Sequence, residues 1–300
     1  MSPVLARDHD LAHPVEGDTA WSESYYFNCY DPVADCGFFS RVGVRPNEGT
    51  IDVGMSVWVP GGGLAHLRHV REQKEMSEGD RPVGPVRYQM VEAGRSWRIT
   101  AEGDTKAGPL SMDVTFDALT PLIGADGQGR DGAGASASTR QMVGKGHLEQ
   151  AGRWSGTITV GSDRTELTGA ALGNRDKSWG PRRWGAPRMW RWFSINIEED
   201  THFGGIRIGT EAGDLSRGWA WIDGRARVMY GVMGEIEARL MGPVGCTSVT
   251  WLDSPALAAA IRTGFAPGDR AGLTAAEIAS HTDPNVAAAL PMAAAGPTST

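Results

Sequence analysis

Short runs of alternating apolar and polar residues, each closed by a turn signal, limit most strongly how this 300-residue chain can fold. Such alternation matches the two-residue repeat of a β-strand with one buried face. The segment VGMSVWVPGGGLAHLRHV contains two such runs around Pro60 and the glycines at 61–63, which predicts a hairpin with a longer loop. A tight hairpin is predicted at Asp223 and Gly224, because Asp-Gly favours the turns that join adjacent strands. We therefore expect an all-β protein with antiparallel sheets of barrel or sandwich type.

Changes in composition divide the chain. Residues 1–20 are polar and are expected to form a loose N-terminal arm. The β pattern covers residues 21–140, including a Gly/Ala/Ser-rich loop at 124–138, and resumes over 141–253. These two stretches have similar lengths, which predicts two barrel-like or sandwich-like halves. An Ala-rich extension, helical or weakly ordered, is expected over 254–300.

Charge and motif content exclude several classes of protein. A net charge of −7 disfavours a general nucleic-acid binder. No apolar run is long enough to cross a membrane as a helix, and the first residues do not resemble a secretory signal, so a cytoplasmic location is expected. The sequence has no nucleotide-binding glycine motif and no zinc-ligand motif, so neither a cofactor nor a metal is expected. The expected partner is a small molecule, and the sequence does not exclude a homodimer.

The segment GNRDKSWGPRRWGAPRMWRW, residues 173–192, combines four tryptophans and six arginines or lysines with a single acid, Asp176. Gly173, Gly180 and Pro181 predict a sharp turn here. Burial would raise the pKa of Asp176 and the neighbouring cations would lower it. Two interpretations stay open: a buried Arg–Asp pair that fixes a bend, or a functional acid.

The motif GNRDKSWGPR, preceded by GHLEQAGRWSGTITV at 146–160 and WSESYYFNCYDP at 21–32, resembles bacterial proteins of the lipocalin-like superfamily. This superfamily includes the carotenoid 1,2-hydratase (hydroxyneurosporene synthase) group, and the resemblance covers residues 21–253. It implies two lipocalin-like β-barrel halves around an apolar pocket, with relatives that hydrate alkenes or steer cyclisations. The family pattern has histidine after the aspartate, where this chain has Lys177, so a role for an imidazole is not carried over.

These observations lead to three functional hypotheses, of which the last is an interaction or structural module in which the bend in residues 173–192 is purely architectural. The first is a cofactor-independent enzyme, a hydratase, lyase, isomerase or cyclase, that uses acid catalysis on a hydrophobic terpenoid, steroid or polyketide-like molecule. A buried carboxylic acid would donate the proton, and aromatic faces would stabilise a carbocation. The alternative is a non-catalytic carrier of a lipid or terpenoid. The candidate acids are Asp176, Glu149 and Glu23. The candidate substrate-binding residues are Trp179, Trp190, Trp192, Tyr26, His66, Arg68, Arg175, Trp219 and Trp221.

Overall fold

The computed structural model describes residues 4–60, 63–126, 144–183, 189–210 and 213–229. Regular structure in these ranges is almost entirely β-strand, which confirms the all-β prediction. The chain divides into two compact units, residues 1–189 with 209–215 and residues 190–208 with 216–300. No helix in the described ranges has the length and the apolar character needed to cross a membrane.

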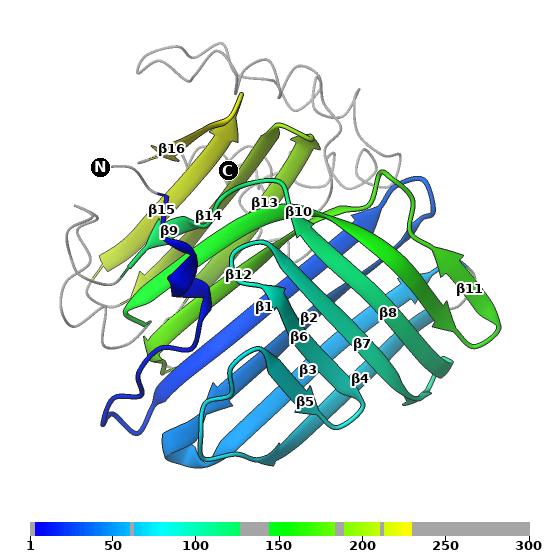
Figure 1. The fold of residues 1–300 in the computed structure, drawn as a ribbon, viewed down its shortest axis with the longest axis horizontal. Coiled ribbons are helices and arrows are strands. Elements are labelled where there is room, and N and C mark those ends of the chain that lie inside the picture. Colours follow the sequence, from blue (N-terminus) through cyan, green and yellow to red (C-terminus); the bar gives the residue numbers. More distant parts are fainter. Residues whose placement is uncertain (1–3, 61–62, 127–143, 184–188, 211–212, 230–300) are drawn as a thin grey trace, which may run out of the picture. The chain divides into compact units, whose positions relative to one another are not determined.

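The first unit contains a 12-stranded antiparallel sheet that curls into a nearly closed barrel. Its strands are β1 (Trp21–Asp31), β2 (Cys36–Arg45), β3 (Thr50–Val59), β4 (Gly63–Glu72), β5 (Asp80–Val83), β6 (Val86–Glu92), β7 (Ser96–Thr105), β8 (Gly108–Ala118), β9 (Ile123–Ala125), β10 (Gly146–Val160), β11 (Asp163–Glu166) and β12 (Leu172–Pro181). The order is β4-β3-β2-β1-β12-β10-β8-β7-β6-β5, and β9 and β11 both pair with β10. In Figure 1, the blue strands β1–β4 and the teal strands β5–β8 form two walls, which β10 and β12 connect.

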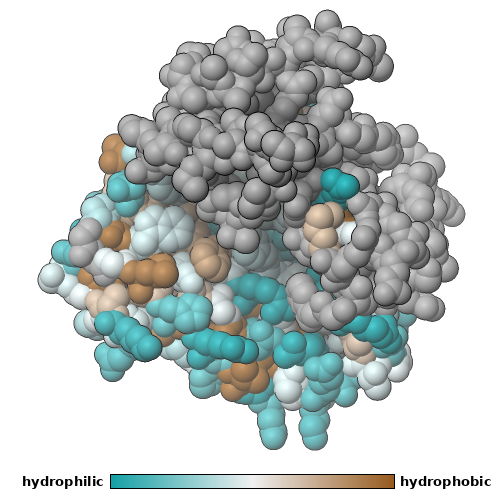
Figure 2. All heavy atoms as spheres, turned by 180° about the vertical axis from the view of Figure 1, so that it is seen from behind, coloured by the Kyte–Doolittle hydropathy of each residue, from teal (hydrophilic) through white to brown (hydrophobic). Residues whose placement is uncertain are grey.

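Alternation along each strand fills the interior of this sheet with apolar side chains. On β1, Tyr25 and Phe27 are fully buried and belong to the main apolar cluster. Trp154 lies at the centre of this cluster, with its ring edge-on to Phe38 at 4.8 Å and to Phe116 at 5.2 Å. Aromatic pairs of this geometry add to the free energy gained by burying their surface. Outside the barrel, exposed apolar side chains occur among hydrophilic ones, brown among teal in Figure 2.

Both predicted hairpins are present. Strands β3 and β4 pair from Thr50 with Glu72 to Val59 with Gly63. In the second unit, Ile222 pairs with Arg225 across a turn in which Asp223 and Gly224 have φ values of 51° and 73°. Positive φ at both central positions is what a tight hairpin turn requires, and Asp-Gly adopts it at low cost.

The predicted sharp turn at residues 173–181 is wrong, because Leu172–Pro181 forms the continuous strand β12. This strand pairs with β1 on one side and with β10 on the other, so its backbone groups are satisfied without a turn. Gly173 permits this pairing, since a Cβ atom there would lie 1.9 Å from the backbone oxygen of Asn28. Gly180, with a φ of 111°, marks a local irregularity near the end of the strand.

The first twenty residues, expected to be a loose arm, are held against the barrel in the described range. Val4 bridges to Ile123, and the nitrogen of Leu5 donates to the carbonyl of Leu122 at 2.9 Å. A short 3-10 helix, η1 (Arg7–Asp10), follows, and its last residue is fully buried. A second one, η2 (Pro46–Glu48), joins β2 to β3.

A second, four-stranded sheet lies mostly in the second unit, in the order β13-β14-β15-β16. One face carries a small apolar cluster of Phe203, Ala220 and Ile222. The predicted C-terminal extension, the boundary between the predicted halves and most of the Gly/Ala/Ser-rich loop lie outside the described residues. The strand bounds are β13 (Met189–Glu198), β14 (Thr201–Thr210), β15 (Gly213–Ile222) and β16 (Arg225–Met229).

Candidate functional site

Strand β12 distributes three neighbouring charged residues to two faces of the sheet. Arg175 and Lys177 are fully buried on the interior face, where each contacts interior aromatic rings. Asp176 points to the opposite face, because successive side chains of a strand alternate. The acid and its two cationic neighbours in the sequence therefore belong to different environments.

On the face opposite the interior, four polar residues form a row across four adjacent strands. We call them the polar row: Arg41 on β2, Tyr26 on β1, Asp176 on β12 and Glu149 on β10. Tyr26 pairs with both Arg41 and Asp176, and Asp176 pairs with Glu149. Directly opposed residues have Cβ atoms about 5 Å apart, which places the two carboxyl groups side by side. Two of the three predicted acids are thus brought together.

Asp176 combines partial burial with a strongly shifted pKa. Loss of solvation raises its pKa to about 6, against the opposing charges of Arg182, Arg41 and Arg175. All three arginines act on Asp176 through their charge. A carboxyl group with this pKa is present in both protonation states near neutral pH, as a general acid or base requires.

The neighbours of Asp176 are polar and largely buried. Burial raises the pKa of Tyr26 to about 12, so its phenol stays protonated and can donate a hydrogen bond. Glu149 is 2% exposed, and its carboxylate lies 3.9 Å from Nδ1 of His147. These side chains could orient water or a substrate oxygen beside Asp176.

The third predicted acid, Glu23, lies on the interior face and is held ionised. Burial alone would raise its pKa, but the hydrogen bond with His13 and the charge of Lys177 outweigh burial and lower it to about 2. The Nζ atom of Lys177 lies 2.8 Å from its carboxylate, and Tyr25 donates to the same carboxylate at 2.7 Å. Glu23 is therefore a fixed anion and a poor proton donor.

Arg175 forms the Arg–Asp pair that the sequence suggested, but with a different partner. Asp10 of η1 accepts from both terminal nitrogens of Arg175, at 2.7 and 2.8 Å, and neither side chain is exposed. Gly94 also donates to Asp10, at 2.6 Å, and Gln150 accepts from Nε of Arg175. Sequence analysis missed Asp10 because it precedes Arg175 by 165 positions and lies in a segment without strand periodicity.

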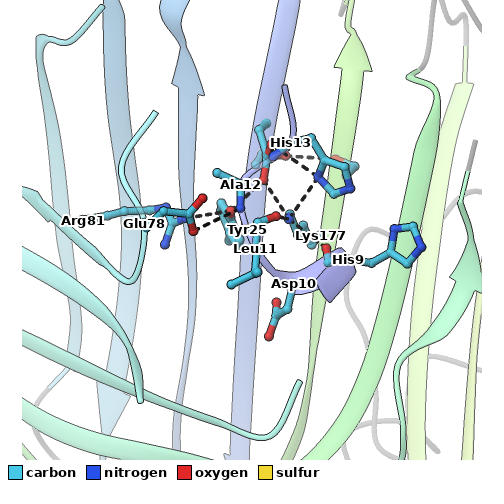
Figure 3. Close-up of polar contacts among 12 residues, drawn as sticks. His9, Asp10, Leu11, Ala12, His13, Tyr25, Glu78, Arg81 and Lys177 are labelled. Atoms are coloured by element: carbon cyan, nitrogen blue, oxygen red, sulfur yellow. Dashed lines mark hydrogen bonds and ion pairs between the residues drawn. The ribbon is translucent and has the colours of Figure 1, made fainter. Parts of the chain in front are cut away.

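The N-terminal segment also surrounds Lys177. Its ammonium group donates to the carbonyl oxygens of His9 and Leu11, and it lies 3.2 Å from Nδ1 of His13 (Figure 3). The ring of His13 stacks on Trp179 with centroids 3.9 Å apart. Trp179, a predicted substrate-binding residue, thus packs on the segment that closes this part of the interior.

The remaining predicted binding residues lie on β4 of the first sheet and on β13 and β15 of the second sheet. His66 and Arg68 are exposed on the edge strand β4, whose buried residues Ala65 and Leu67 face the other way. Trp219 is 5% exposed, and it shares a face of β15 with Trp221, opposite the apolar cluster of that sheet. Trp192 is partly buried on β13. The side chain of Trp190, also on β13, lies outside those described.

The two cysteines in the described part of the chain, Cys29 and Cys36, are poor candidates for chemistry. Cys29 and Cys36 are buried and unpaired, and burial raises the pKa of Cys36 to about 11 and that of Cys29 well above its usual value. Thiolates, not thiols, are the nucleophilic and metal-binding forms. Within the described ranges, no group of three or more His, Cys, Asp or Glu side chains could hold a metal ion.

A family model described as a domain of unknown function, DUF7064, matches residues 6–264. The chain belongs to this family. The match includes η1 and every strand of both sheets, so Asp10, the polar row and the interior contacts of this DUF7064 chain all fall within the family's extent. A comparison with curated protein sequences gives no match.

Solved structures share the fold of the DUF7064 chain. An AttH-like protein from Nitrosomonas europaea matches with a TM-score of 0.54 and 14% identity, over 70% of this chain and 68% of that chain. Kievitone hydratase from Nectria haematococca matches with a TM-score of 0.49 and 13% identity, over 68% of this chain and 63% of that chain. CghA matches with a TM-score of 0.44 and 14% identity, over 69% and 59%. The first likeness supports the barrel-like fold that the sequence resemblance implied, and none of them addresses the RDxSWGPR motif.

Proposed function

We propose that this protein is a cofactor-independent enzyme that acts on a hydrophobic small molecule, as a hydratase, lyase, isomerase or cyclase. Asp176 is the proposed proton donor. The observation that carries the proposal is the polar row, in which a carboxyl group with a pKa of about 6 lies between a phenol and a second carboxyl group. The fold likeness alone does not carry it, because one fold serves many activities.

The proposed chemistry begins with proton transfer from the neutral form of Asp176 to an alkene or a similar carbon centre. Such a transfer leaves a carbocation, and Asp176 becomes a carboxylate that the charges of Arg182 and Arg41 stabilise. Glu149 then accepts a proton, either from a water molecule that attacks the cation or from a neighbouring carbon. The first outcome is hydration and the second is isomerisation. Tyr26 is proposed to hold the water or a polar substituent of the substrate by a hydrogen bond.

Tryptophan faces are the proposed apolar component of substrate binding. An indole face attracts a cation and excludes water, as a carbocation intermediate requires. Trp190, Trp192, Trp219 and Trp221 belong to strands β13 and β15 of the second unit, and their role in substrate binding stays a prediction from the sequence. The substrate class, a terpenoid, steroid or polyketide-like molecule, is proposed on this basis.

The carrier hypothesis fits the described contacts less well. In it, Arg175 and Arg182 would hold an anionic head group, but Asp10 and Gln150 already accept from Arg175. A carrier also has no need of a desolvated carboxyl group such as that of Asp176. It remains the alternative that the following experiment distinguishes.

The experiment compares the wild type with Asp176→Asn in deuterated, ¹⁸O-enriched water. Apolar molecules extracted with the purified protein, and a panel of terpenoids and polyketides, are incubated with each protein and examined by mass spectrometry. We expect the wild type to add water or to exchange hydrogen for deuterium, and Asp176→Asn to do so about 100-fold or more slowly while it still binds the ligand.

Asp113→Asn is the matched control, because Asp113 is half exposed and pairs with Arg98 on the surface. It should retain wild-type turnover. Full turnover by Asp176→Asn would contradict the proposed mechanism. Tight ligand binding by the wild type without any change in mass would favour the carrier.

A further inference from the structure

Among the residues that the structure describes, the interior of the first unit contains three fully buried cations and, beside them, two fully buried carboxylates. Arg81, Arg175 and Lys177 are each 0% exposed, as are Asp10 and Glu23. Asp10 pairs with Arg175, and Glu23 pairs with Lys177. Among the described residues, Arg81 has no carboxylate within 4 Å. One positive charge of this group is therefore left without a counter-ion.

Deprotonation of Lys177 would remove the surplus charge, but its contacts argue against it. Three oxygen atoms that can only accept surround Nζ: the carbonyls of His9 and Leu11 and the carboxylate of Glu23. Satisfying all three takes three N–H donors, which only the ammonium form has. Burial lowers the pKa of Lys177, and the charge of Glu23 opposes this lowering. Because of its three acceptors we take Lys177 as charged, and we assign the surplus positive charge to Arg81.

Arg81 differs from Arg175 in how few of its donors are used. Arg175 donates through all three of its nitrogens, to Gln150 and Asp10. Arg81 donates only through Nη2, to the phenol oxygen of Tyr25 at 2.8 Å, and its buried Nε and Nη1 atoms have no hydrogen-bond partner. These two atoms carry three of the five N–H donors of a guanidinium.

The surroundings of Arg81 stabilise its charge only in part. Its guanidinium lies 4.2 Å from the ring centroid of Tyr25 and 5.5 Å from that of Trp97, and Figure 3 shows it reaching toward Tyr25. Aromatic faces attract a cation, but they do not replace the hydrogen bonds lost on burial. The phenol cannot serve as the counter-ion, because burial and the charge of Glu23 raise the pKa of Tyr25 far above neutrality.

We propose that Arg81 anchors a buried binding site for a small carboxylate, of the size of formate or acetate, in the interior of the first unit. One bound carboxylate would accept from part of these unused N–H groups, at Nε or at Nη1, and balance the third cation. The site lies on the interior face of the sheet, whereas the polar row lies on the other face, so this inference does not depend on the proposed catalysis. Arg81 belongs to β5, a four-residue strand that pairs only with β6, and fraying of such an edge strand offers a route of entry.

The experiment measures the thermal midpoint of the full chain as chloride is replaced by formate or acetate at constant pH and ionic strength. For the wild type we expect a saturable rise of about 3 °C or more. Arg81→Met should lose this rise, and without carboxylate it should be no less stable than the wild type, because it removes an uncompensated charge. Arg87→Met is the matched control, since Arg87 on the neighbouring strand is half exposed and paired with Asp80. It should keep the rise, and so should Asp176→Asn.

Equal rises for the wild type and Arg81→Met would overturn the proposal, as would the absence of a saturable rise in the wild type. If Arg81→Met does not fold, the wild type is titrated with ¹³C-labelled formate and observed by NMR. A bound signal that saturates and that acetate displaces supports the site. Its absence, or a crystal structure with water alone at Nε and Nη1 of Arg81 in the presence of formate, overturns it.

Discussion

At the scale of single residues, the position of a charged group on β12 determines its protonation. Arg175, Asp176 and Lys177 follow one another, yet the two cations share buried ion pairs while the acid has a pKa raised to about 6. The difference arises from alternation, since the residue between two inward-facing side chains must face the other way. The Arg–Asp pair that the sequence suggested for Asp176 is therefore formed by Asp10, and Asp176 stays the proposed functional acid.

Asp176→Asn should stabilise the protein in a pH-dependent way. The folded pKa of about 6 exceeds the usual value of 3.8, so folding favours the neutral form. The stability contributed by that form is present below pH 3.8 and is lost as the pH rises through about 6. Urea unfolding should show nearly equal free energies for the two proteins at pH 4 and a gain of about 3 kcal/mol for the variant at pH 8.

Asp113→Asn is the control for this measurement, because the expected change in its free energy of unfolding at pH 8 has the opposite sign. The hydrogen bond from Arg98 lowers the pKa of Asp113, so ionisation is favoured in the folded state and its loss cannot stabilise the protein at pH 8. A gain at pH 8 shared by both variants would show that the effect does not come from the desolvation of Asp176.

Glu23→Gln should be strongly destabilising, because it leaves Lys177 buried without its carboxylate. Removing one partner of a buried ion pair costs about 3–5 kcal/mol. The double variant Glu23→Gln/Lys177→Met removes both charges and should recover much of that loss. The free energy of unfolding from urea titrations at pH 7 measures both. A single variant as stable as the wild type would contradict the assignment of a charged pair.

The same pair predicts acid sensitivity. The pKa of Glu23 is lowered from 4.5 to about 2, so its contribution to stability is present above pH 4.5 and is lost as the pH falls toward 2. In Glu23→Gln/Lys177→Met this part of the acid dependence should be absent.

Sequence analysis identified Asp176 because one acid among many cations and tryptophans is unusual for either a core strand or a loop. It could not bring Asp176 and Glu149 together, since their proximity depends on the register between β10 and β12. It also could not exclude Glu23, because the partners that keep Glu23 ionised, His13 and Lys177, come from segments far apart in the chain. Residue type identified candidates, whereas register and burial distinguished among them.

At the scale of elements, β12 tolerates little added volume where it meets β1. A Cβ atom on Gly173 would lie 1.9 Å from the oxygen of Asn28 and 2.8 Å from Nε1 of Trp154. That indole nitrogen donates to the same oxygen at 2.8 Å, so the contact joins two strands and the centre of the apolar cluster. Because a backbone atom cannot rotate away as a side chain can, the strands themselves would have to separate.

Gly173→Ala should therefore destabilise the protein by about 3 kcal/mol or more, as measured by chemical denaturation. Gly54→Ala is the matched control, because Gly54 also lies in a strand, β3, and nothing lies within 4 Å of a Cβ atom placed there. It should change the free energy of unfolding by less than about 1 kcal/mol. Similar losses for both variants would show that strand propensity, rather than the close approach of β1, limits Gly173.

At the scale of the whole molecule, the fold class was predictable and the division into units was less so. Alternation and turn signals predicted the β3–β4 and β15–β16 hairpins, because both depend on neighbouring residues. The first sheet instead extends to Pro181, well past the predicted boundary of the first half at residue 140. β12 joins it by pairing with β1, about 150 residues earlier, and local periodicity carries no information about such a pairing.

A polypeptide of residues 1–189 should fold cooperatively by itself. All strands of the first sheet lie between Trp21 and Pro181, and so does every residue of the main apolar cluster. Circular dichroism should show a β spectrum and a sigmoidal unfolding transition. Introduced into this polypeptide, Gly173→Ala should cost as much as in the full chain. A β spectrum that appears only in the full chain would show that the first sheet depends on the rest of the protein.

The two-sided use of β12 has a consequence for how this protein can evolve. Arg175 and Lys177 face the interior, and Asp176 between them faces the other way. Insertion of one residue would exchange the two faces of the strand, and the buried ion pairs and the polar row would be lost together. Substitutions that alter the polar row without disturbing the buried ion pairs are therefore confined to the flanking strands, such as β1 and β10, rather than to β12 itself. Among related sequences, we therefore expect β12 to vary less than its neighbours β1 and β10.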